Sequence, residues 1–375
     1  MRIALITFHH VINYGSALQS YATQTILEKL NCEVDIIDYV NNVNRDDLLL
    51  SNRANEFKLG KIPIIRQIYM LFNWYDKYKL LKVFNDYWTS KLNLTERFYS
   101  NEEIKNLLKK SYDAYCTGSD QVWNTKVSTN SRGVDPAFYL DFTSDEKYCF
   151  SYAASFGMTS VTLDEKNKIK NLLKKYKYIS VREKAGLEIL RQLGYSDAKI
   201  VLDPTLLIEK EEWRVFSKPI KVPTRYILVY QLHKNKKMKK YIKNMSKLLN
   251  VPIVNIAFSW RGYLQSKYAA YAISPEQYVY LFDNAEYIIT DSFHATVFSI
   301  IFEKKFVSIY SDQFNNRIQN ILEITNLEDR HLEDYNDLDL LLKDINFDEA
   351  KKRIEIEKNF SWKWLKNVIN NINFN

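Results

Sequence analysis

The sequence predicts an α/β protein built from two Rossmann-like domains. Short apolar runs rich in β-branched and aromatic residues alternate with segments of helical apolar spacing along the 375 residues, as in parallel sheets flanked by helices. Most strand-like runs end in a small or polar cluster, as expected for loops at one edge of such a sheet. A polar stretch containing Pro219 and Pro223 interrupts the pattern, and we place a domain boundary there. We predict a first domain at 1–215 and a second domain at 216–345. A C-terminal helix at 346–375 is expected to cross back to the first domain.

The first half contains the alternation of strands and helices in its simplest form. Its expected strands are 3–8, 33–39, 112–117, 147–154, 178–181 and 198–202. Its clearest helices are 17–30 and 185–193. The second half repeats the alternation, with strands expected at 226–232, 252–258, 287–290 and 306–310. Its expected helices are 234–249, 275–283, 293–302, 314–322 and 348–372. Two such halves facing across a cleft is the GT-B-like arrangement of many glycosyltransferases.

The regular alternation breaks over about 41–110, which we interpret as a helical, aromatic insertion in the first domain. The segment 57–91 mixes Tyr, Trp and Phe with Lys and Arg. One interpretation is a basic aromatic helix on an acidic membrane surface. The other is a helix that packs its aromatic stripe on the domain and exposes its lysines to water.

The charge and the cysteines restrict the cellular setting. The formal net charge of +8 is modest for this length and spread along the chain, which favours anionic ligands or an anionic membrane surface, and we expect no nucleic-acid partner. Cys32, Cys116 and Cys149 lie far apart in apolar contexts, as buried free thiols do in a reducing compartment. We see no signal peptide and no run long enough to span a bilayer. We therefore expect a cytoplasmic protein, at the inner face of the membrane if the aromatic segment docks there.

The stretch 286–310 gives the first candidate site. Asp291 and Ser292 follow a strand-like run and precede a helix that is apolar on nearly every face, which places His294 in the first turn of a buried helix at the carboxyl end of a strand. Free backbone N–H groups and the positive end of the helix dipole favour an anion at such a position. His294 then either holds or protonates that anion, or is a core histidine.

The first loop, 9–16, gives the second candidate site. It follows a strand and precedes a helix, as in dinucleotide-binding proteins, but Gly15 is its only glycine. A single glycine does not allow the close pyrophosphate approach of the G-x-G-x-x-G loop, so we expect no NAD or FAD. His9 and His10 directly continue the strand 3–8, and neighbouring side chains on a strand point to opposite faces, so we expect no metal site.

Five motifs at strand ends give the chain a resemblance to a known family. They read T-F-H-x-x-x-N-Y-G-x-x-L-Q, G-S-D-Q-V-W, S-V-R-E, D-P-T and D-S-F-H-A, and begin at Thr7, Gly118, Ser180, Asp203 and Asp291. Together and in this order they resemble the polysaccharide pyruvyl transferases, over roughly 3–331. That family looks GT-B-like.

The resemblance implies an enzyme that needs no cofactor. Similar proteins move the enolpyruvyl group of phosphoenolpyruvate onto a sugar of a bacterial surface polysaccharide, often on a lipid carrier, which closes a pyruvate ketal and releases phosphate. Arg182 and His294 match the family's donor-binding residues. The chemistry needs fixed cations, a general acid and a general base; we assign His294 as the acid and Asp120 as the base. The other predicted substrate-binding residues lie in the same motifs: His9, Asn13, Gly15, Gln19, Ser119, Gln121, Trp123 and Ser292.

Each predicted role has a simpler alternative. Arg182 would otherwise form a surface ion pair with Glu183 or Glu188, and Asp120 would only cap its own turn. Many family members carry an arginine where this chain has Ser292, so we expect Arg317, one loop beyond the next strand, to supply the missing cation. Arg317 would otherwise pair with Glu323 or Asp312 on the surface. A GT-B glycosyltransferase that uses a nucleotide sugar, and a non-catalytic sugar-binding protein, are the alternative functions.

Overall fold

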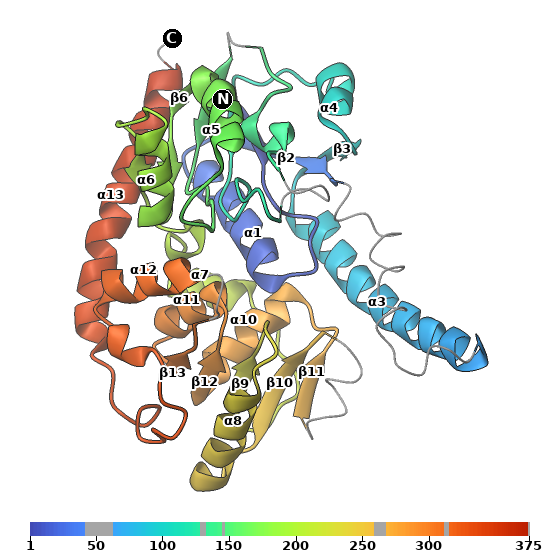
Figure 1. The fold of residues 1–375 in the computed structure, drawn as a ribbon, viewed down its shortest axis with the longest axis vertical. Coiled ribbons are helices and arrows are strands. Elements are labelled where there is room, and N and C mark those ends of the chain that lie inside the picture. Colours follow the sequence, from blue (N-terminus) through green and yellow to red (C-terminus); the bar gives the residue numbers. More distant parts are fainter. Residues whose placement is uncertain (42–62, 128–132, 145–146, 259–267, 311–314, 374–375) are drawn as a thin grey trace. The chain divides into compact units, whose positions relative to one another are not determined.

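The computed structural model describes the chain except for residues 42–62, 128–132, 145–146, 259–267, 311–314 and 374–375 (Figure 1). The described residues form two compact units. Unit 1 comprises 1–74, 85–207 and 357–375, and unit 2 comprises 75–84 and 208–356. The polar stretch with Pro219 and Pro223 thus lies inside unit 2, shortly after the change of unit.

Unit 1 contains a six-stranded sheet whose strands all pair in parallel, in the order β3-β2-β1-β4-β5-β6. The strands are β1 (Arg2–Ile6), β2 (Glu33–Tyr39), β3 (Leu94–Phe98), β4 (Ala114–Thr117), β5 (Tyr148–Ser151) and β6 (Tyr176–Tyr178). A separate parallel pair consists of β7 (Ser180–Val181) and β8 (Lys199–Ile200). The helices are α1 (Tyr14–Glu28), α3 (Pro63–Lys91, shared between the units), α4 (Asn101–Leu107), α5 (Leu163–Leu172) and α6 (Lys184–Gln192). Short 3-10 turns are η2 (Pro136–Tyr139), η3 (Leu173–Lys175) and η4 (Pro204–Leu206).

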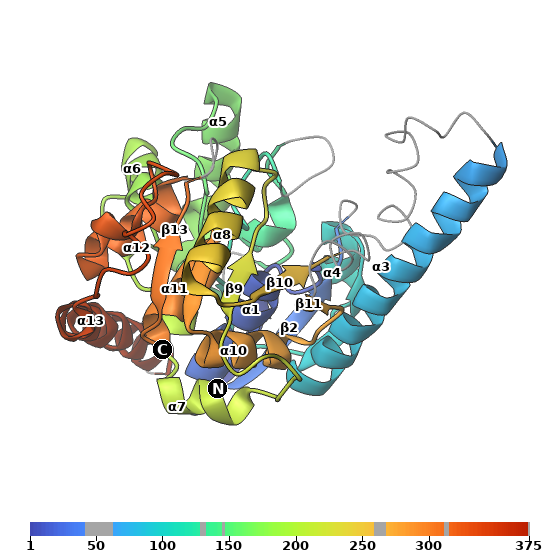
Figure 2. The same cartoon turned by 90° about the horizontal axis from the view of Figure 1, so that it is seen from below.

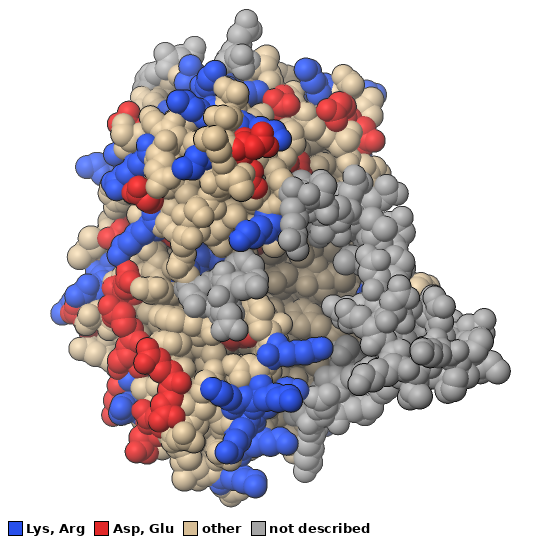
Figure 3. Space-filling model, viewed as in Figure 1, with Lys and Arg blue, Asp and Glu red and all other residues tan. Residues whose placement is uncertain are grey.

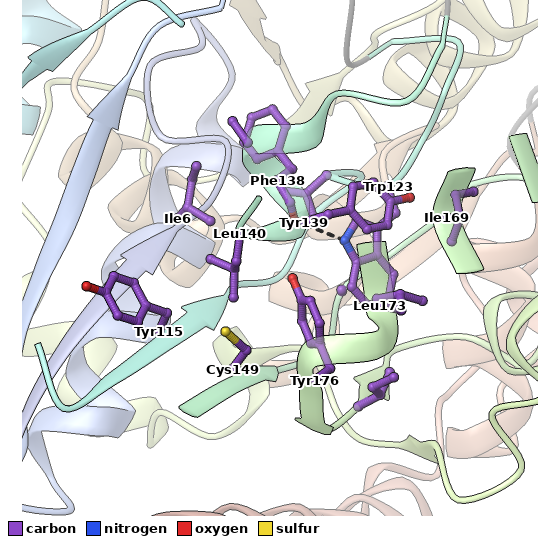
Figure 4. Packing of buried hydrophobic residues seen from close by; sticks show 14 of the residues in the cluster. Ile6, Tyr115, Trp123, Phe138, Tyr139, Leu140, Cys149, Ile169, Leu173 and Tyr176 are labelled. Carbon is purple, nitrogen blue, oxygen red and sulfur yellow. Dashed lines mark hydrogen bonds between the residues drawn. The ribbon is translucent and has the colours of Figure 1, made fainter. Parts of the chain in front are cut away.

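An aromatic cluster fills one face of the unit 1 sheet (Figure 4). The Trp123 indole stacks on Tyr139 and donates its N–H to the Phe138 carbonyl oxygen over 3.1 Å. Phe8 and Tyr39 meet the ring of Phe138 edge-on. Such ring pairs add directional attraction to the burial of apolar area, so η2 is firmly attached to the sheet.

Unit 2 contains a five-stranded parallel sheet in the order β11-β10-β9-β12-β13. The strands are β9 (Ile227–Tyr230), β10 (Ile253–Ala257), β11 (Tyr268–Tyr271), β12 (Tyr287–Thr290) and β13 (Lys305–Ser308). The helices are α7 (Lys210–Phe216), α8 (Lys236–Leu249), α10 (Pro275–Asn284), α11 (Phe293–Ile301) and α12 (Asn315–Thr325), with the turn η5 (Glu328–Arg330). The last helix, α13 (Phe347–Asn373), begins in unit 2 and ends in unit 1.

Helices cover both faces of the unit 2 sheet. Met238 and Tyr241 of α8 pack with Val229 and Ile289 on one face. On the other face, Tyr278 of α10 meets the ring of Tyr230, and Figure 2 shows α8 and α10 on opposite sides of β9. Alternate side chains of a strand point to opposite faces. The apolar runs of β9 and β12 therefore follow from burial on both faces.

The aromatic insertion also contributes a strand that the sequence analysis did not predict. β3 pairs in parallel with β2 at the edge of the sheet, and only two of its five residues, Leu94 and Phe98, are large and apolar. Residues 42–62, where the insertion begins, lie outside the described part of the chain. None of the helices in the described part is both long and apolar enough to cross a bilayer.

Lysines gather on one helix of unit 2. α8 reads K-K-M-K-K-Y-I-K-N-M-S-K-L-L and holds no acidic residue. Its lysines are exposed, and blue side chains gather in the lower part of Figure 3. The apolar positions Met238, Tyr241, Ile242 and Met245 are buried, so the helix is amphipathic, with a strongly basic outer face.

The stability of unit 1 depends on pH through the buried carboxyl group of Asp135. Burial raises the pKa of this carboxyl to about 6, from 3.8, although the Tyr39 hydroxyl and the Ala137 N–H donate to it. Because the folded-state pKa is raised, the stabilising contribution is complete below about pH 3.8 and is lost as the pH rises through about 6. Asp135→Asn, which cannot ionise, should therefore stabilise the protein relative to wild type above pH 7, by up to roughly 3 kcal/mol.

The measurement is the denaturation midpoint of both proteins between pH 4 and pH 8. The advantage of Asp135→Asn should be smallest at pH 4 and grow through pH 6. An advantage that does not change with pH would contradict the assignment.

Candidate functional site

All five histidines of the sequence lie next to the carboxyl ends of parallel strands. His9 and His10 follow β1, and His233 follows β9. His294 follows β12, and His331 pairs with Ser308 at the end of β13. Ligands of open α/β sheets bind at this edge, so each unit presents a candidate site of its own.

The strand register brings three loops together at the edge of the unit 2 sheet. Thr290, the last residue of β12, lies opposite Tyr230 of β9 and Ser308 of β13. The chain that follows each of these residues therefore leaves the sheet at the same level. The buried Asp291 connects two of the loops, because its carboxylate accepts the N–H groups of Leu232 and His233 over 2.7 and 2.8 Å.

The α11 helix begins directly after Asp291. Ser292 occupies the N-cap position with extended backbone, but its hydroxyl does not cap the helix. Its carbonyl oxygen accepts the Thr296 N–H and hydroxyl, which fixes the first turn. His294 is the second helical residue and is buried. The structure thus confirms the predicted strand-to-helix transition and leaves N–H groups of this turn without a side-chain cap from Ser292.

Arg317 lies close to the same helix terminus. Its guanidinium carbon is 5.9 Å from the centre of the Phe293 ring, and Phe293 meets the His294 ring edge-on. Since Arg317 is on α12, this contact brings the start of α12 to the site. Glu323, one of the two alternative partners, accepts the side-chain amide of Gln319, and Asp312 lies outside the described residues. Donor binding by Arg317 remains a prediction.

The edge of the unit 1 sheet carries a buried polar network. Asn13 caps α1 by accepting the N–H groups of Gly15 and Ser16. Ser16 donates its hydroxyl to Asp120 over 2.5 Å. The side-chain amide of Gln19 donates to the hydroxyls of Thr7 and Ser20. The opening motif is therefore built around the start of α1, which explains why this helix begins three residues before the predicted position.

Asp120 is held on both carboxylate oxygens. Oδ2 accepts from Ser16, and Oδ1 accepts from Arg182 and from the N–H of Gln121. Its φ is +73°, a left-handed conformation that costs a non-glycine residue energy and is concentrated at functional sites. The bond to Gln121 is the turn cap that we considered as the alternative. A role as general base remains a prediction.

Arg182 connects three of the recognised motifs by ion pairs. Its guanidinium contacts Asp203 at 2.7 Å, Asp120 at 3.3 Å and Glu183 at 3.7 Å, and its side chain is only 1% exposed. Burial by itself lowers the pKa of Arg182, but the three carboxylates outweigh burial and raise it. The arginine therefore stays charged, and its alternative as a surface ion pair is wrong because the pair with Glu183 is buried. An anionic donor would have to compete with these carboxylates.

Glu183 explains the last position of the S-V-R-E motif. Its Oε1 accepts the hydroxyl of Ser155 and the N–H of Phe156, which holds the loop after β5. Gly157 ends this loop at φ +59°, and a Cβ there would lie 2.1 Å from Oε1 of Gln121. That oxygen accepts the side-chain amide of Asn124. Only glycine at position 157 leaves Gln121 in this place.

Two other residues that were predicted to contact the substrate have their side chains bound to other parts of the protein. The Trp123 indole belongs to the aromatic core (Figure 4), so contact with a substrate would require that packing to open. The Ser119 hydroxyl donates to Asp203. Their placement is explained by the fold, and substrate contact remains a prediction for both.

The expectation that His9 and His10 point to opposite faces is wrong. β1 ends at Ile6, and both residues lie in a tight turn in which His9 donates its N–H to Thr7 and Val11 donates its own to His9. Ligand atoms of His9, His10 and Asp38 consequently lie within 4.8 Å of one another. The Arg97 guanidinium contacts both Asp38 and His10 Nδ1; the expectation of no metal at this place stays a prediction.

A sequence model of the polysaccharide pyruvyl transferase family matches residues 13–313. The chain belongs to this family. The match begins at the cap of α1 and includes all the later motif residues discussed above. Comparison with curated proteins finds no match.

Solved structures with the same architecture show a fold of the GT-B type. A putative UDP-N-acetylglucosamine 2-epimerase from Listeria monocytogenes has a TM-score of 0.52 at 10% identity and covers 94% of this chain and 90% of its own. The UDP-GlcNAc 2-epimerase from Neisseria meningitidis has a TM-score of 0.51 at 9% identity and covers 98% and 99%. UGT89C1 of Arabidopsis thaliana, solved with UDP-L-rhamnose, has a TM-score of 0.50 at 10% identity and covers 98% of both chains. These likenesses show the fold alone.

Two groups of residues at the sites of this pyruvyl transferase family member were not predicted from its sequence. Ser16 and Asp203 complete the polar network of unit 1, and Asp203 had been noted only as part of a motif. His233 and the carboxylate of Asp291 form a pair in unit 2. The one available signal was their position just beyond strand ends, because no motif includes His233.

Proposed function

We propose that this protein transfers the enolpyruvyl group of phosphoenolpyruvate to a sugar of a polysaccharide precursor, closes a pyruvate ketal and releases phosphate. Membership of the family supports pyruvyl transfer. The observation that carries the choice of donor is the start of α11, where His294 lies in a first turn that Ser292 does not cap and Arg317 approaches Phe293.

The chemistry of the donor suits that helix terminus. Phosphoenolpyruvate carries a phosphate and a carboxylate, and backbone N–H groups with the helix dipole attract one of them. An arginine binds the other with two parallel hydrogen bonds. His294 then protonates the methylene carbon or stabilises the departing phosphate. The protein supplies all of these groups, so we propose that no cofactor takes part.

We expect Arg317→Ala to weaken phosphoenolpyruvate binding, because charge-assisted contacts contribute roughly 1.5–3 kcal/mol. Arg317→Lys should recover only part of the loss if the contact uses both guanidinium nitrogens. Calorimetric titration measures both affinities. Lys343→Ala, which removes an ordinary lysine of the same unit, is the control for net charge. Equal affinity in wild type and Arg317→Ala would show that the cation comes from elsewhere.

We propose that the acceptor sugar is carried by a membrane lipid and that α3 meets the membrane. Trp74, Tyr75 and Tyr78 are each about half exposed, at 50%, 52% and 50%. The Lys79 ammonium lies 4.7 Å from the centre of the Tyr75 ring. Exposed aromatic rings beside lysines are typical of helices at membrane interfaces. Buried Tyr87 and Trp88 on the same helix show that its other end packs on the protein, as the alternative interpretation of the insertion had it.

Binding to anionic phosphatidylglycerol vesicles should weaken as salt rises, because salt screens exposed charges. Neutralising Lys77, Lys79 and Lys82 together should reduce vesicle binding without changing activity on a soluble acceptor. Neutral phosphatidylcholine vesicles are the control. If binding is absent, or does not respond to salt, the membrane role of α3 is wrong.

The proposed function is tested by incubating the protein with phosphoenolpyruvate and a panel of soluble and carrier-linked sugars. Mass spectrometry should find a product heavier by one pyruvate ketal, together with released phosphate. A nucleotide sugar consumed in place of phosphoenolpyruvate would instead indicate a glycosyltransferase. If neither donor is consumed and a sugar still binds, the protein is a non-catalytic member of the family.

A further inference from the structure

We propose that His233 is the general base that takes the proton of the acceptor hydroxyl, with Asp291 as its positioning residue. This inference rests on the proposed function and names a residue that no motif includes. It moves the base from Asp120 in unit 1 to the edge of unit 2, where His294 also lies. Three features of the His233–Asp291 pair support this role.

The first observation is the geometry of the pair. His233 Nδ1 lies 3.1 Å from Asp291 Oδ2. A carboxylate only accepts hydrogen bonds, so Nδ1 carries the proton and donates it. In the neutral ring Nε2 is then the basic nitrogen. A carboxylate that fixes the tautomer and orientation of an imidazole in this way is the arrangement found behind catalytic histidines.

The second observation is the difference in exposure between the two side chains. The Asp291 side chain is 3% exposed, whereas that of His233 is 47% exposed. Asp291 is further held by the N–H groups of Leu232 and His233. The carboxylate therefore has a fixed position, while the imidazole that it holds is open to a molecule arriving from solvent.

The third observation is the place of the pair in the sheet. His233 follows β9 and His294 follows β12, and the last residues of these strands, Tyr230 and Thr290, lie opposite each other. Two imidazoles thus follow neighbouring strands at one edge of the sheet. One is buried in the first turn of α11, and the other is half exposed. The burial of His294 suits a group that acts on the bound donor, and the exposure of His233 suits a group that receives an acceptor.

Asp120 is a poorer candidate for the same step. Its two carboxylate oxygens already accept from Ser16, Gln121 and Arg182. Each of these bonds stabilises the carboxylate and would weaken if the group took up a proton. When His233 takes up a proton on Nε2, the hydrogen bond from its Nδ1 to Asp291 stays in place.

With His233 as the base and His294 as the acid, every proton and every bond of the reaction is accounted for. The first acceptor hydroxyl gives its proton to Nε2 of His233 while its oxygen bonds to C2 of the enolpyruvyl group. C3 takes a proton from His294 and becomes the methyl group. A second hydroxyl then bonds to C2 as the bond from C2 to the phosphate oxygen breaks. Phosphate leaves with the proton of that hydroxyl, and solvent restores both histidines.

The tautomer of His233 is tested without any assay of activity. In full-length protein labelled with ¹⁵N-histidine, long-range ¹H–¹⁵N spectra should show neutral His233 with its proton on Nδ1. In Asp291→Asn, whose amide can donate to the ring, the proton should move to Nε2. An Nε2–H tautomer in wild type would overturn the proposal, and so would a tautomer that Asp291→Asn does not change.

The catalytic role is tested with phosphoenolpyruvate and the acceptor that the sugar screen identifies. His233→Ala should lower kcat by roughly a hundredfold or more, and added imidazole should restore part of the rate because the site is open to solvent. Asp291→Asn should lower kcat by roughly tenfold or more. Asp120→Asn should lose less than His233→Ala.

The matched control is His331→Gln. His331 lies at the same sheet edge, but its ring stacks on Tyr310 and its Nδ1 bonds to the Ser308 carbonyl oxygen. This variant should keep the wild-type rate and show no response to imidazole. Wild-type kcat in His233→Ala, or a loss that imidazole does not restore in a folded protein, would overturn the proposal. If wild type itself transfers no pyruvate, the proposed function fails, and the role of His233 as its base fails with it, while the tautomer measurement still decides whether Asp291 orients the ring.

Discussion

His294→Gln is expected to leave the fold intact and to remove most pyruvyl transfer. The residue lies in the first turn of α11, beside the N–H groups that we assign to the donor anion. Loss of a general acid typically lowers a rate by roughly a hundred- to ten-thousandfold. The measurement is kcat for phosphate release from phosphoenolpyruvate with the identified acceptor, together with the denaturation midpoint.

Ser299→Ala separates a catalytic effect from damage to the helix. Ser299 is buried in the same helix, beyond the first turn, and donates its hydroxyl to the Ala295 carbonyl oxygen. Its loss should reduce stability slightly and leave kcat unchanged. If His294→Gln retained wild-type kcat, His294 would have no part in the reaction. If it lost stability as strongly as activity, His294 would be the core histidine of the alternative interpretation.

The second large effect is expected when Arg182 is replaced, and the property that it changes most is the stability of the fold. Arg182→Met should destabilise the protein by roughly 3–5 kcal/mol, because Asp120, Glu183 and Asp203 would be left as buried carboxylates without their cation. The resemblance to the family assigns Arg182 to donor binding only. Its contacts now make the fold the first property to be affected.

Urea denaturation measures this loss, and a second substitution tests its cause. Arg182→Met combined with Asp203→Asn should recover part of the lost stability, since one unpaired charge has been removed. Arg182→Lys keeps the charge and should lose less. Titration of phosphoenolpyruvate into folded Arg182→Lys then isolates donor binding. An Arg182→Met protein as stable as wild type would show that the ion-pair network adds nothing to the fold.

The repeating elements could be predicted because their signals are local. The strands at 33–39 and 287–290 were predicted with the observed bounds. Both stretches are rich in β-branched and aromatic residues, and the second stops sharply at Asp291 and Ser292. β3 was missed because an edge strand with exposed polar residues lacks that pattern. The expected strand at 178–181 is divided between β6 and β7, a bend that a run of apolar residues does not reveal.

The candidate site could be predicted only where a residue belongs to a motif. The first turn of α11 was located from Asp291 and Ser292 alone, since a small polar pair between a strand and a helix marks a helix start. The bond between Ser16 and Asp120 joins residues 104 positions apart, and the pair of His233 and Asp291 spans 58. Such contacts depend on the strand order, which local patterns do not specify. The turn that brings His9 and His10 together is local, but it was missed because the two residues directly follow an apolar run that reads as a strand.

The path of α13 has a consequence for synthesis on the ribosome. Residues 357–375 belong to unit 1 although unit 2 lies before them in the chain. The hydroxyl oxygen of Ser361 accepts the Leu202 N–H, and Trp364 meets the Tyr152 ring. Domains usually fold in the order in which they emerge, but unit 1 emerges first and remains without its last helix until unit 2 has been made. Nascent chains stalled before α13 should therefore expose the part of unit 1 that this helix covers, and be the stage at which a chaperone binds.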